Sequence, residues 1–324
     1  MKTVISTDRA AAVELLRKGD VVALPTETVY GLAANALNPI AVAKIFEAKE
    51  RPHFDPLIVH LPNREWLEKI VDVPAADRQV IGKLTDKFWP GPFTVVLPKR
   101  DIIPDIVTAG LDTVAVRLSA QPVFAEIVGK LNEPLAVPSA NRFGRVSPTT
   151  AHHVLDELDG RIRLIVDAGA TEHGIESTIV SVQEGKIAIL RRGPITDEQL
   201  AEFADIVSVH VTQRVSAPGQ LPSHYRPATP LCLIDRAEDF LKPKDQRVGL
   251  LAWKSSGNSA ADTERFAAFR NLSQRGDLRE AAANLFRYLR ELDVLGLDLI
   301  VAERVPSQGL GAAIMDRLQR ASHR

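Results

Sequence analysis

The chain has 324 residues, of which 45 % are hydrophobic and 25 % charged, a profile typical of a globular protein with two domains. The formal net charge of −1 excludes a chain-wide cationic field for nucleic acid, and an aromatic content of 5 % disfavours a stacking surface for single strands. A single cysteine excludes a disulfide framework within the chain, and without a signal-like start or a membrane-length apolar run we expect a cytoplasmic protein.

The first part of the chain alternates short strands with helices at irregular intervals. The apolar periodicity predicts helices at 8–18, 38–49, 64–70, 75–88 and 122–131. It predicts strands at 21–24, 57–61, 93–97, 113–118, 135–138, 164–167, 178–182 and 186–190. The second helix has a clear start, because Asn38 is a good cap and Pro39 suits the first helical position. This irregular pattern predicts an α/β fold with a twisted, open, mixed sheet.

A proline-rich linker is predicted over 214–230, between a first domain at 1–213 and a second at 231–324. Four prolines crowd this stretch: Pro218, Pro222, Pro227 and Pro230. Beyond it, strands are predicted at 231–234, 248–253, 269–272 and 297–302, with helices near Thr263, at 277–292 and from Leu310. This regular alternation predicts a smaller, Rossmann-like parallel α/β domain at the C-terminus.

Cationic and hydroxyl side chains gather where predicted strands and helices end. Pro52 forces Arg51 out of the helical region, so we expect an extended Lys-Glu-Arg segment. In an extended segment Lys49 and Arg51 share a face while Glu50 points away. An anion-binding pocket at the edge of the sheet is therefore predicted from these two cations and from Arg117, Ser139, Asn141, Ser177, Thr178 and Arg191.

Other motifs are better explained by ordinary structure. Gly309-Leu310-Gly311 imitates the start of a dinucleotide fingerprint but fits a tight turn, and the sequence contains no P-loop and no acyl-enzyme nucleophile motif. One set of side chains that could ligate a metal is His152, His153 and Asp156, but a solvated helix face explains this set better. A second set is His53, Asp55 and His60, but the nearby cations would repel a metal ion there. No metal held by the protein alone is expected.

Six segments of the first part of the chain form an ordered series of short motifs: 25–32 (Pro-Thr-Glu-Thr-Val-Tyr-Gly-Leu), Lys49-x-Arg51-Pro52, 56–60, 139–141 (Ser-Ala-Asn), 176–180 and 190–193. Together they resemble the YrdC/Sua5 family of threonylcarbamoyl-AMP synthases. The segment 309–318 resembles the C-terminal extension of the two-domain Sua5 type. Glu50 departs from the family pattern, which commonly has Gly between the two cations, and this would limit how closely the backbone approaches a phosphate.

The resemblance implies an enzyme that makes L-threonylcarbamoyl-AMP from L-threonine, bicarbonate and ATP, for the t6A37 modification of tRNAs that read ANN codons. Lys49 and Arg51 would be catalytic. Threonine would be bound by Thr28, His60, Arg117, Ser177 and the backbone of Val137. ATP would be bound by Arg51, Asp55, Thr113, Ser139, Asn141, Ser147, Arg191 and, from the linker, Tyr225.

The resemblance also implies Mg2+ held through the ATP phosphates, no organic cofactor, and no membrane. Implied partners are the downstream tRNA threonylcarbamoyl-transferase proteins and a weak contact with tRNA. One alternative is a non-catalytic protein of the same fold that binds tRNA or double-stranded RNA. A carbamoyltransferase accessory is disfavoured, because no acylphosphatase or zinc-finger segment accompanies the domain.

Overall fold

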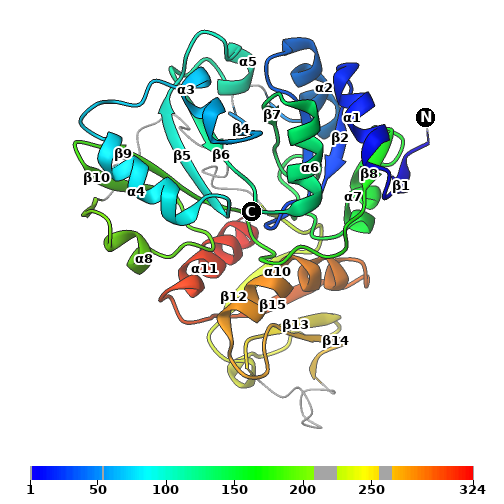
Figure 1. Cartoon of the computed structure of the whole chain (residues 1–324). Coiled ribbons are helices and arrows are strands. Elements are labelled where there is room, and N and C mark those ends of the chain that lie inside the picture. The colour runs from blue at the N-terminus through cyan, green and yellow to red at the C-terminus, as the bar shows by residue number, and fades with distance from the viewer. Residues whose placement is uncertain (1, 53–54, 208–224, 255–264, 324) are drawn as a thin grey trace. The chain divides into compact units, whose positions relative to one another are not determined.

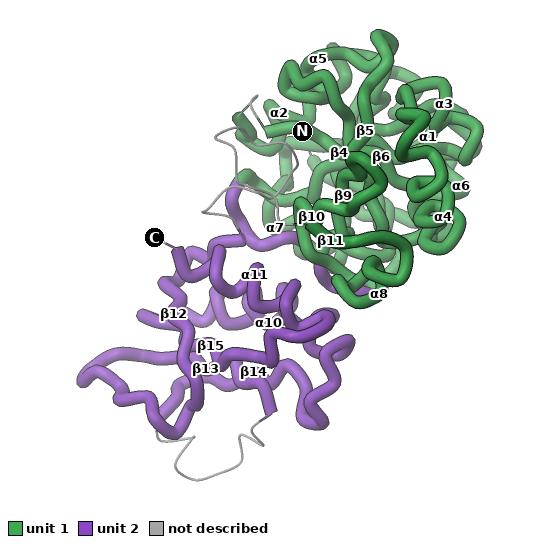
Figure 2. The backbone as a smooth tube through the Cα atoms, turned by 90° about the vertical axis from the view of Figure 1, so that its left-hand side faces the viewer, with its two compact units in different colours: residues 1–143, 148–172, 176–221 green, residues 144–147, 173–175, 222–324 purple. Residues whose placement is uncertain are grey.

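The computed structural model (Figure 1) describes residues 2–52, 55–207, 225–254 and 265–323. The chain divides into two compact units (Figure 2), one of residues 1–143, 148–172 and 176–221, the other of residues 144–147, 173–175 and 222–324. Two short segments of the second unit therefore interrupt the first unit in the sequence. Most of the predicted linker lies outside the described residues, so the predicted domain limits stay predictions.

The first unit contains one mixed sheet of eleven strands. Their order is β1 (Val4–Ser6), β8 (Leu164–Val166), β2 (Val22–Leu24), β3 (Gly31–Asn35), β7 (Leu135–Ala136), β4 (Ile58–His60), β6 (Thr113–Arg117), β5 (Phe93–Pro98), β9 (Thr178–Gln183), β10 (Lys186–Arg191) and β11 (Ile206–Val207). β4 runs parallel to β6, β5 runs antiparallel to β6, and β9 runs parallel to β5. The predicted mixed sheet is confirmed.

Helices pack on both faces of this sheet. On one face, α1 (Arg9–Arg17) and α6 (Pro122–Leu131) share a core cluster with Val22 and Leu24 of β2. On the other face, α2 (Pro39–Lys49), α4 (Arg78–Phe88) and α7 (Ala151–Leu158) share a cluster with Val21 and Ala23. The two clusters take alternate residues of one strand, because successive strand side chains point to opposite faces. The remaining helices are η1 (Arg64–Trp66), α3 (Leu67–Ile70), α5 (Asp105–Thr108) and α8 (Asp197–Ala201).

Most predicted elements of the first unit are confirmed to within a few residues. α6 has the predicted bounds, and α2 begins as predicted, since the Asn38 side chain accepts hydrogen bonds from the backbone of Ile40 and Ala41. The predicted helix at 64–70 is a 3-10 turn followed by one α-helical turn. Strands β1, β3 and β11 were not predicted. They are short, and β3 reads Gly-Leu-Ala-Ala-Asn, which lacks the β-branched residues that mark strands.

The second unit contains a four-stranded parallel sheet, as predicted. Its order is β12 (Leu231–Ile234), β15 (Leu299–Glu303), β13 (Val248–Ala252) and β14 (Ala268–Asn271), and all three neighbouring pairs are parallel. Its helices are η2 (Ala237–Asp239), α10 (Leu278–Asp293) and α11 (Leu310–Ser322). Gly309 makes the tight turn predicted before α11, with φ 54° and ψ −133° at the N-cap. Gly311, in the first turn of α11, permits close packing, because a Cβ there would lie 1.8 Å from the carbonyl oxygen of Pro306. The helix predicted near Thr263 lies outside the described residues.

Candidate active site

The predicted threonine-binding residues of β4 and β6 lie on one face of the first sheet. Alternation along β6 puts Thr113 and Arg117 on the same face, and the strand register pairs Arg117 with His60 on one side and with Thr94 on the other. The same alternation gives this face a small buried apolar cluster of Ile58, Val96, Ala115 and Ile179. Strands β4, β5, β6 and β9 thus form an apolar surface on this face, with polar side chains at the strand ends.

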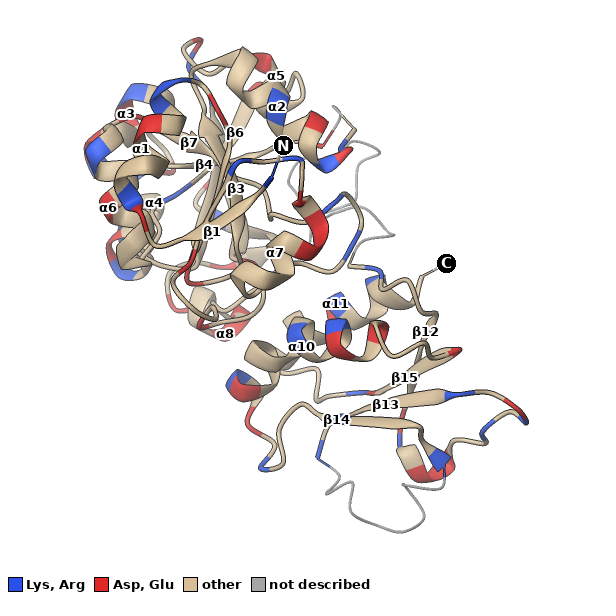
Figure 3. Ribbon diagram, turned by 90° about the vertical axis from the view of Figure 1, so that its right-hand side faces the viewer, with Lys and Arg blue, Asp and Glu red and all other residues tan. Residues whose placement is uncertain are grey.

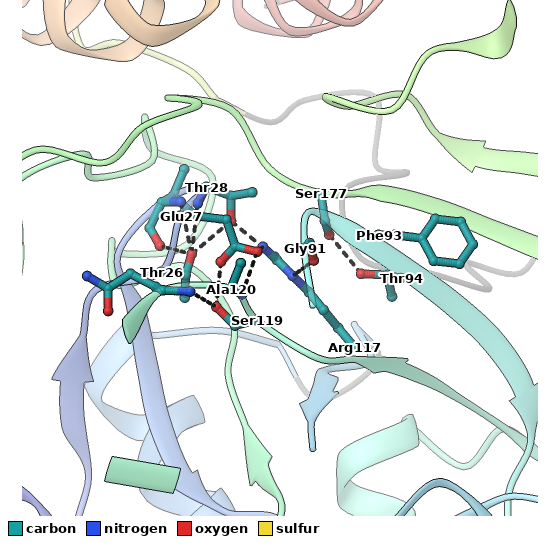
Figure 4. Close-up of polar contacts among 12 residues, drawn as sticks. Thr26, Glu27, Thr28, Gly91, Phe93, Thr94, Arg117, Ser119, Ala120 and Ser177 are labelled. Atoms are coloured by element: carbon teal, nitrogen blue, oxygen red, sulfur yellow. Dashed lines mark hydrogen bonds and ion pairs between the residues drawn. The ribbon is translucent and has the colours of Figure 1, made fainter. Parts of the chain in front are cut away.

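A buried ion pair between Arg117 and Glu27 lies at the end of β6 on this face (Figure 4). Arg117 Nη2 lies 2.8 Å from Glu27 Oε1, and the Glu27 carboxylate also accepts hydrogen bonds from the Ser119 hydroxyl and, at 3.2 Å, from the Ala120 N–H. Burial alone would raise the pKa of Glu27, but the Arg117 charge and these hydrogen bonds lower it to about 2. Glu27 is therefore ionised at neutral pH.

Arg117 also orients the hydroxyl of Thr28. Arg117 Nη1 donates to Thr28 Oγ1 at 3.0 Å, and the hydroxyls of Thr26 and Thr28 are 2.8 Å apart. The Thr26 hydroxyl donates its proton to the carbonyl of Val29 at 2.6 Å, since a carbonyl can only accept. The Thr28 hydroxyl is then the donor to Thr26, and it keeps one lone pair for a further donor such as an ammonium or hydroxyl group.

His60 is buried beside this pair, with its ring centroid 5.1 Å from that of Phe124. Burial lowers the pKa of His60 to about 3, the Arg117 charge lowers it too, and Glu27 and the Ile58 backbone oppose the shift. The imidazole is therefore neutral. Within the described parts of the chain, neither ring nitrogen has a partner in hydrogen-bond geometry. A buried polar group in this state is suited to binding a ligand.

Lys49 lies at the end of α2 and is buried. Its ammonium donates to the backbone carbonyls of Ser139 and Asn141, so the structure brings together three residues predicted to act on ATP. Burial lowers the pKa of Lys49 well below its usual value, and the Arg51 charge adds to this shift. The Lys49 amino group thus holds the 139–141 segment in place through these two hydrogen bonds.

Arg51 and Asp55, both predicted to bind ATP, pair with each other. Arg51 Nη2 lies 2.9 Å from Asp55 Oδ2 and donates to the carbonyl of Pro56 at 2.9 Å. Burial raises the pKa of Asp55, while Arg51, Lys49 and Arg191 act in the opposite direction. The three cations therefore all act electrostatically on this one carboxylate.

The extended conformation predicted around Glu50 is wrong. Glu50 caps α2 in the left-handed region, with φ 53° and ψ 39°. The Glu50 N–H bonds to Glu47 O, and the Arg51 N–H bonds to Phe46 O at 3.0 Å, so the chain turns back over the helix end in a Schellman-type cap. A left-handed cap is usually glycine, which accounts for the glycine common in the family. The Glu50 side chain pairs with Arg161 at 2.7 Å.

Ser177 links the two predicted halves of the site. Its hydroxyl lies 2.8 Å from that of Thr94 and accepts a hydrogen bond from Arg191 Nη2 at 3.1 Å. Arg191 Nε also donates to the Ser177 carbonyl at 3.1 Å. Gly193 permits this packing, because a Cβ there would lie 2.4 Å from the backbone nitrogen of Thr178. A residue predicted for threonine thus contacts one predicted for ATP.

The other predicted residues fall into two groups. Val137 belongs to the first unit, where its N–H donates to the Ile58 carbonyl at 2.9 Å. Ser147 and Tyr225 belong to the second unit. There the Ser147 carbonyl accepts from Arg290, and the Tyr225 ring stacks on Phe286 at 5.4 Å with the Arg317 guanidinium 5.2 Å from its centroid.

Three residues of the site were not predicted from the sequence: Glu27, Thr94 and Ser119. Glu27 lies between two hydroxyl residues, but its partner Arg117 is far away in the sequence, so no local pattern reveals the pair. The described part of the chain contains no cluster of three or more His, Cys, Asp or Glu side chains that could hold a metal ion, and His53 lies outside it. No helix within that part is long and apolar enough to cross a membrane.

Comparison with known proteins identifies the family. Residues 14–193 match the Sua5/YciO/YrdC family, described as "Telomere recombination", and residues 195–323 match the "Threonylcarbamoyl-AMP synthase, C-terminal domain". The chain belongs to the threonylcarbamoyl-AMP synthase family. This confirms the resemblance found in the sequence, including the two-domain Sua5 type.

Similar family members cover nearly the whole chain. The threonylcarbamoyl-AMP synthase of Bacillus subtilis is 41 % identical over 329 residues, covering 97 % of this chain and 92 % of the relative. That of Pyrococcus abyssi is 38 % identical over 329 residues, covering 96 % and 93 %. The crystal structure of P. abyssi Sua5 complexed with L-threonine matches with a TM-score of 0.85 at 36 % identity, covering 99 % of this chain and 98 % of that one.

Proposed function

We propose that this protein synthesises L-threonylcarbamoyl-AMP from L-threonine, bicarbonate and ATP, with release of pyrophosphate, as a nucleotidyltransferase. The observation that carries the proposal is the position of Ser177, whose hydroxyl accepts from Arg191 and lies 2.8 Å from that of Thr94, the β5 residue that pairs with Arg117 in the strand register. Family membership and the L-threonine bound to the related P. abyssi protein support the choice of amino acid.

The chemistry requires two anions to approach each other. The threonine amine attacks CO2 and loses a proton, or attacks bicarbonate with loss of water, to give an N-carboxylate. An oxygen of that carboxylate then attacks the α-phosphorus of ATP, and the bond from that phosphorus to the leaving pyrophosphate breaks. Arg51 and Arg191 would offset the repulsion and stabilise charge on the phosphoryl oxygens, so catalysis would consist mainly of positioning and electrostatics. No covalent enzyme intermediate is required.

The hydrogen-bonding capacity of Thr28 and His60 suits them to bind threonine. The Thr28 hydroxyl accepts from a donor, and the neutral His60 ring offers one acceptor and one donor. Arg117 would bind the threonine carboxylate. Mg2+ would arrive with the ATP phosphates and reduce their charge.

The product would serve the t6A37 modification of tRNAs that read ANN codons, through downstream tRNA threonylcarbamoyl-transferase proteins. The alternative of a non-catalytic RNA-binding protein needs a surface of one sign. Along α10 and α11, cationic and anionic side chains are interspersed (Figure 3), and pairs such as Arg320–Asp316 of α11 at 3.0 Å neutralise each other. This distribution favours the enzyme.

Pyrophosphate release tests the proposal. We expect release only when ATP, L-threonine and bicarbonate are all present, and release that is independent of threonine or bicarbonate would contradict it. Arg51→Ala should lower kcat/KM by about 10²-fold or more, because it removes a donor to developing charge. Arg51→Lys is the matched control that keeps the charge and should retain more activity. Circular dichroism would verify that both variants fold, and near-normal turnover of Arg51→Ala would remove Arg51 from the mechanism.

A further inference from the structure

Glu27 is a buried carboxylate to which neither the sequence motifs nor the proposed chemistry assigns a role. Its side chain is 5 % exposed, and all its described polar contacts lie within the threonine end of the site. Such a group is costly to bury unless it is paired and hydrogen-bonded. The arrangement around it indicates what it does there.

The Arg117 guanidinium is held in three directions (Figure 4). Nη2 pairs with Glu27, Nη1 donates to Thr28 Oγ1 at 3.0 Å, and Nε donates to the Gly91 carbonyl at 3.2 Å. A guanidinium carries five N–H bonds in a planar fork. Those to Gly91 and Thr28 are hydrogen-bonded, and Nη2, although ion-paired with Glu27, has no partner in hydrogen-bond geometry among the described residues, so N–H bonds of Nη1 and Nη2 remain for a ligand. Gly91 and Thr28 are neutral acceptors, and Glu27 is therefore the charged anchor of the fork.

The Glu27 carboxylate is itself fixed. Ser119 donates its hydroxyl to Oε2, and the Ala120 N–H donates to Oε1 at 3.2 Å. Both donors follow directly after β6, the strand that ends at Arg117. The loop after the strand thus holds the carboxylate that orients the last side chain of the same strand.

We propose that Glu27 is the positioning residue of the amino-acid subsite, fixing Arg117 so that its remaining N–H bonds face the threonine carboxylate. This inference rests on the proposed function, because it takes threonine as the ligand. The low pKa of Glu27 supports it, since the anchor stays charged across the physiological range. The charge of Glu27 also balances Arg117 beside the neutral ring of His60.

Calorimetric binding of L-threonine and, separately, of ATP to the full chain tests the inference. Glu27→Gln keeps the size and most hydrogen bonds but removes the charge, and we expect it to weaken threonine binding at least tenfold while ATP binding stays within twofold of the unchanged protein. Glu27→Ala should weaken threonine binding further, and added acetate should restore part of the loss by filling the vacated position. Glu303→Gln is the matched control, because Glu303 is a buried carboxylate of the second unit that accepts from Ala237 and Trp253. It should leave threonine affinity unchanged.

The outcomes separate this inference from the proposed function. If the unchanged protein binds threonine and forms product, but Glu27→Gln binds threonine within twofold of it, the inference fails and the function stands. If Glu27→Gln weakens threonine and ATP equally, Glu27 supports the fold rather than Arg117, and the inference again fails. If the unchanged protein binds no threonine, the function and the inference fall together. Should Glu27→Ala not fold, the Gln variant still decides.

Discussion

The neutral state of His60 links the site to the stability of the protein. The His60 side chain is buried, neither ring nitrogen has a hydrogen-bond partner among the described residues, and its pKa is lowered to about 3. The unfolded chain binds a proton at this position below about pH 6.5, whereas the folded protein does not. Stability at this position is therefore lost as the pH falls from 6.5 towards 3.

We expect His60→Gln to remove this pH dependence. Between pH 7 and pH 5, the free energy of unfolding of the unchanged protein should fall by about 2 kcal/mol more than that of His60→Gln. This pH range lies above the range in which Glu27 affects stability, because the pKa of Glu27 is 4.5 in the unfolded chain and about 2 in the folded protein. Urea denaturation at the two pH values measures the difference. His152→Gln, on the exposed side of α7, is the control, and an equal fall in all three proteins would contradict the assignment of a neutral, buried His60.

At the residue scale, motifs predict some of the site and geometry supplies the rest. Thr28 lies in the family segment 25–32 and Arg117 at the end of a predicted strand, and their contact in the structure agrees with a shared site. Glu27 and Ser119 could not be predicted, because their partners are distant in sequence and a lone acidic residue in a loop is usually solvated. The ligand roles themselves stay predictions.

At the element scale, the end of α2 decides how its two cations are presented. The left-handed Glu50 ends the helix, and Lys49 turns inward to the carbonyls of Ser139 and Asn141. Pro52 alone predicts an extended segment there, because proline disfavours the helical conformation of the residue before it. The helix cap sets a different conformation at Glu50. Local propensity predicts where α2 ends. Backbone hydrogen bonds of its last turn determine the conformation of the residues at that end.

Substitution of Glu50 should reveal this conformation. Glu50→Gly relieves the left-handed backbone strain, whereas Glu50→Ala keeps it. Both variants lose the exposed ion pair with Arg161. The Gly variant should therefore be more stable than the Ala variant by about 1 kcal/mol. In an ordinary helix or extended position the order would be the reverse, because glycine is the more flexible residue in the unfolded chain. Thermal or urea unfolding of the two variants measures the order, and an Ala variant as stable as the Gly variant would disprove the left-handed cap.

At the scale of the whole molecule, the change of pattern after the linker was enough to predict a mixed sheet followed by a parallel one. The assignment of short segments to each unit was not predictable. Residues 173–175 join the second unit, where a Cβ at Gly174 would lie 2.5 Å from the carbonyl of Ala282. Such close packing depends on residues over 100 positions apart, which apolar periodicity cannot detect. Ser147 and Tyr225, both predicted to bind ATP, also belong to this unit.

Identification of the reaction product tests the central claim most directly. The protein would be incubated with ATP, L-threonine and isotopically labelled bicarbonate, and the nucleotides separated and analysed by mass spectrometry. We expect a threonylcarbamoyl adenylate that carries the label in its carbamoyl carbon, formed together with an equal amount of pyrophosphate. An adenylate of threonine without the label, or AMP and pyrophosphate with no adduct, would contradict it.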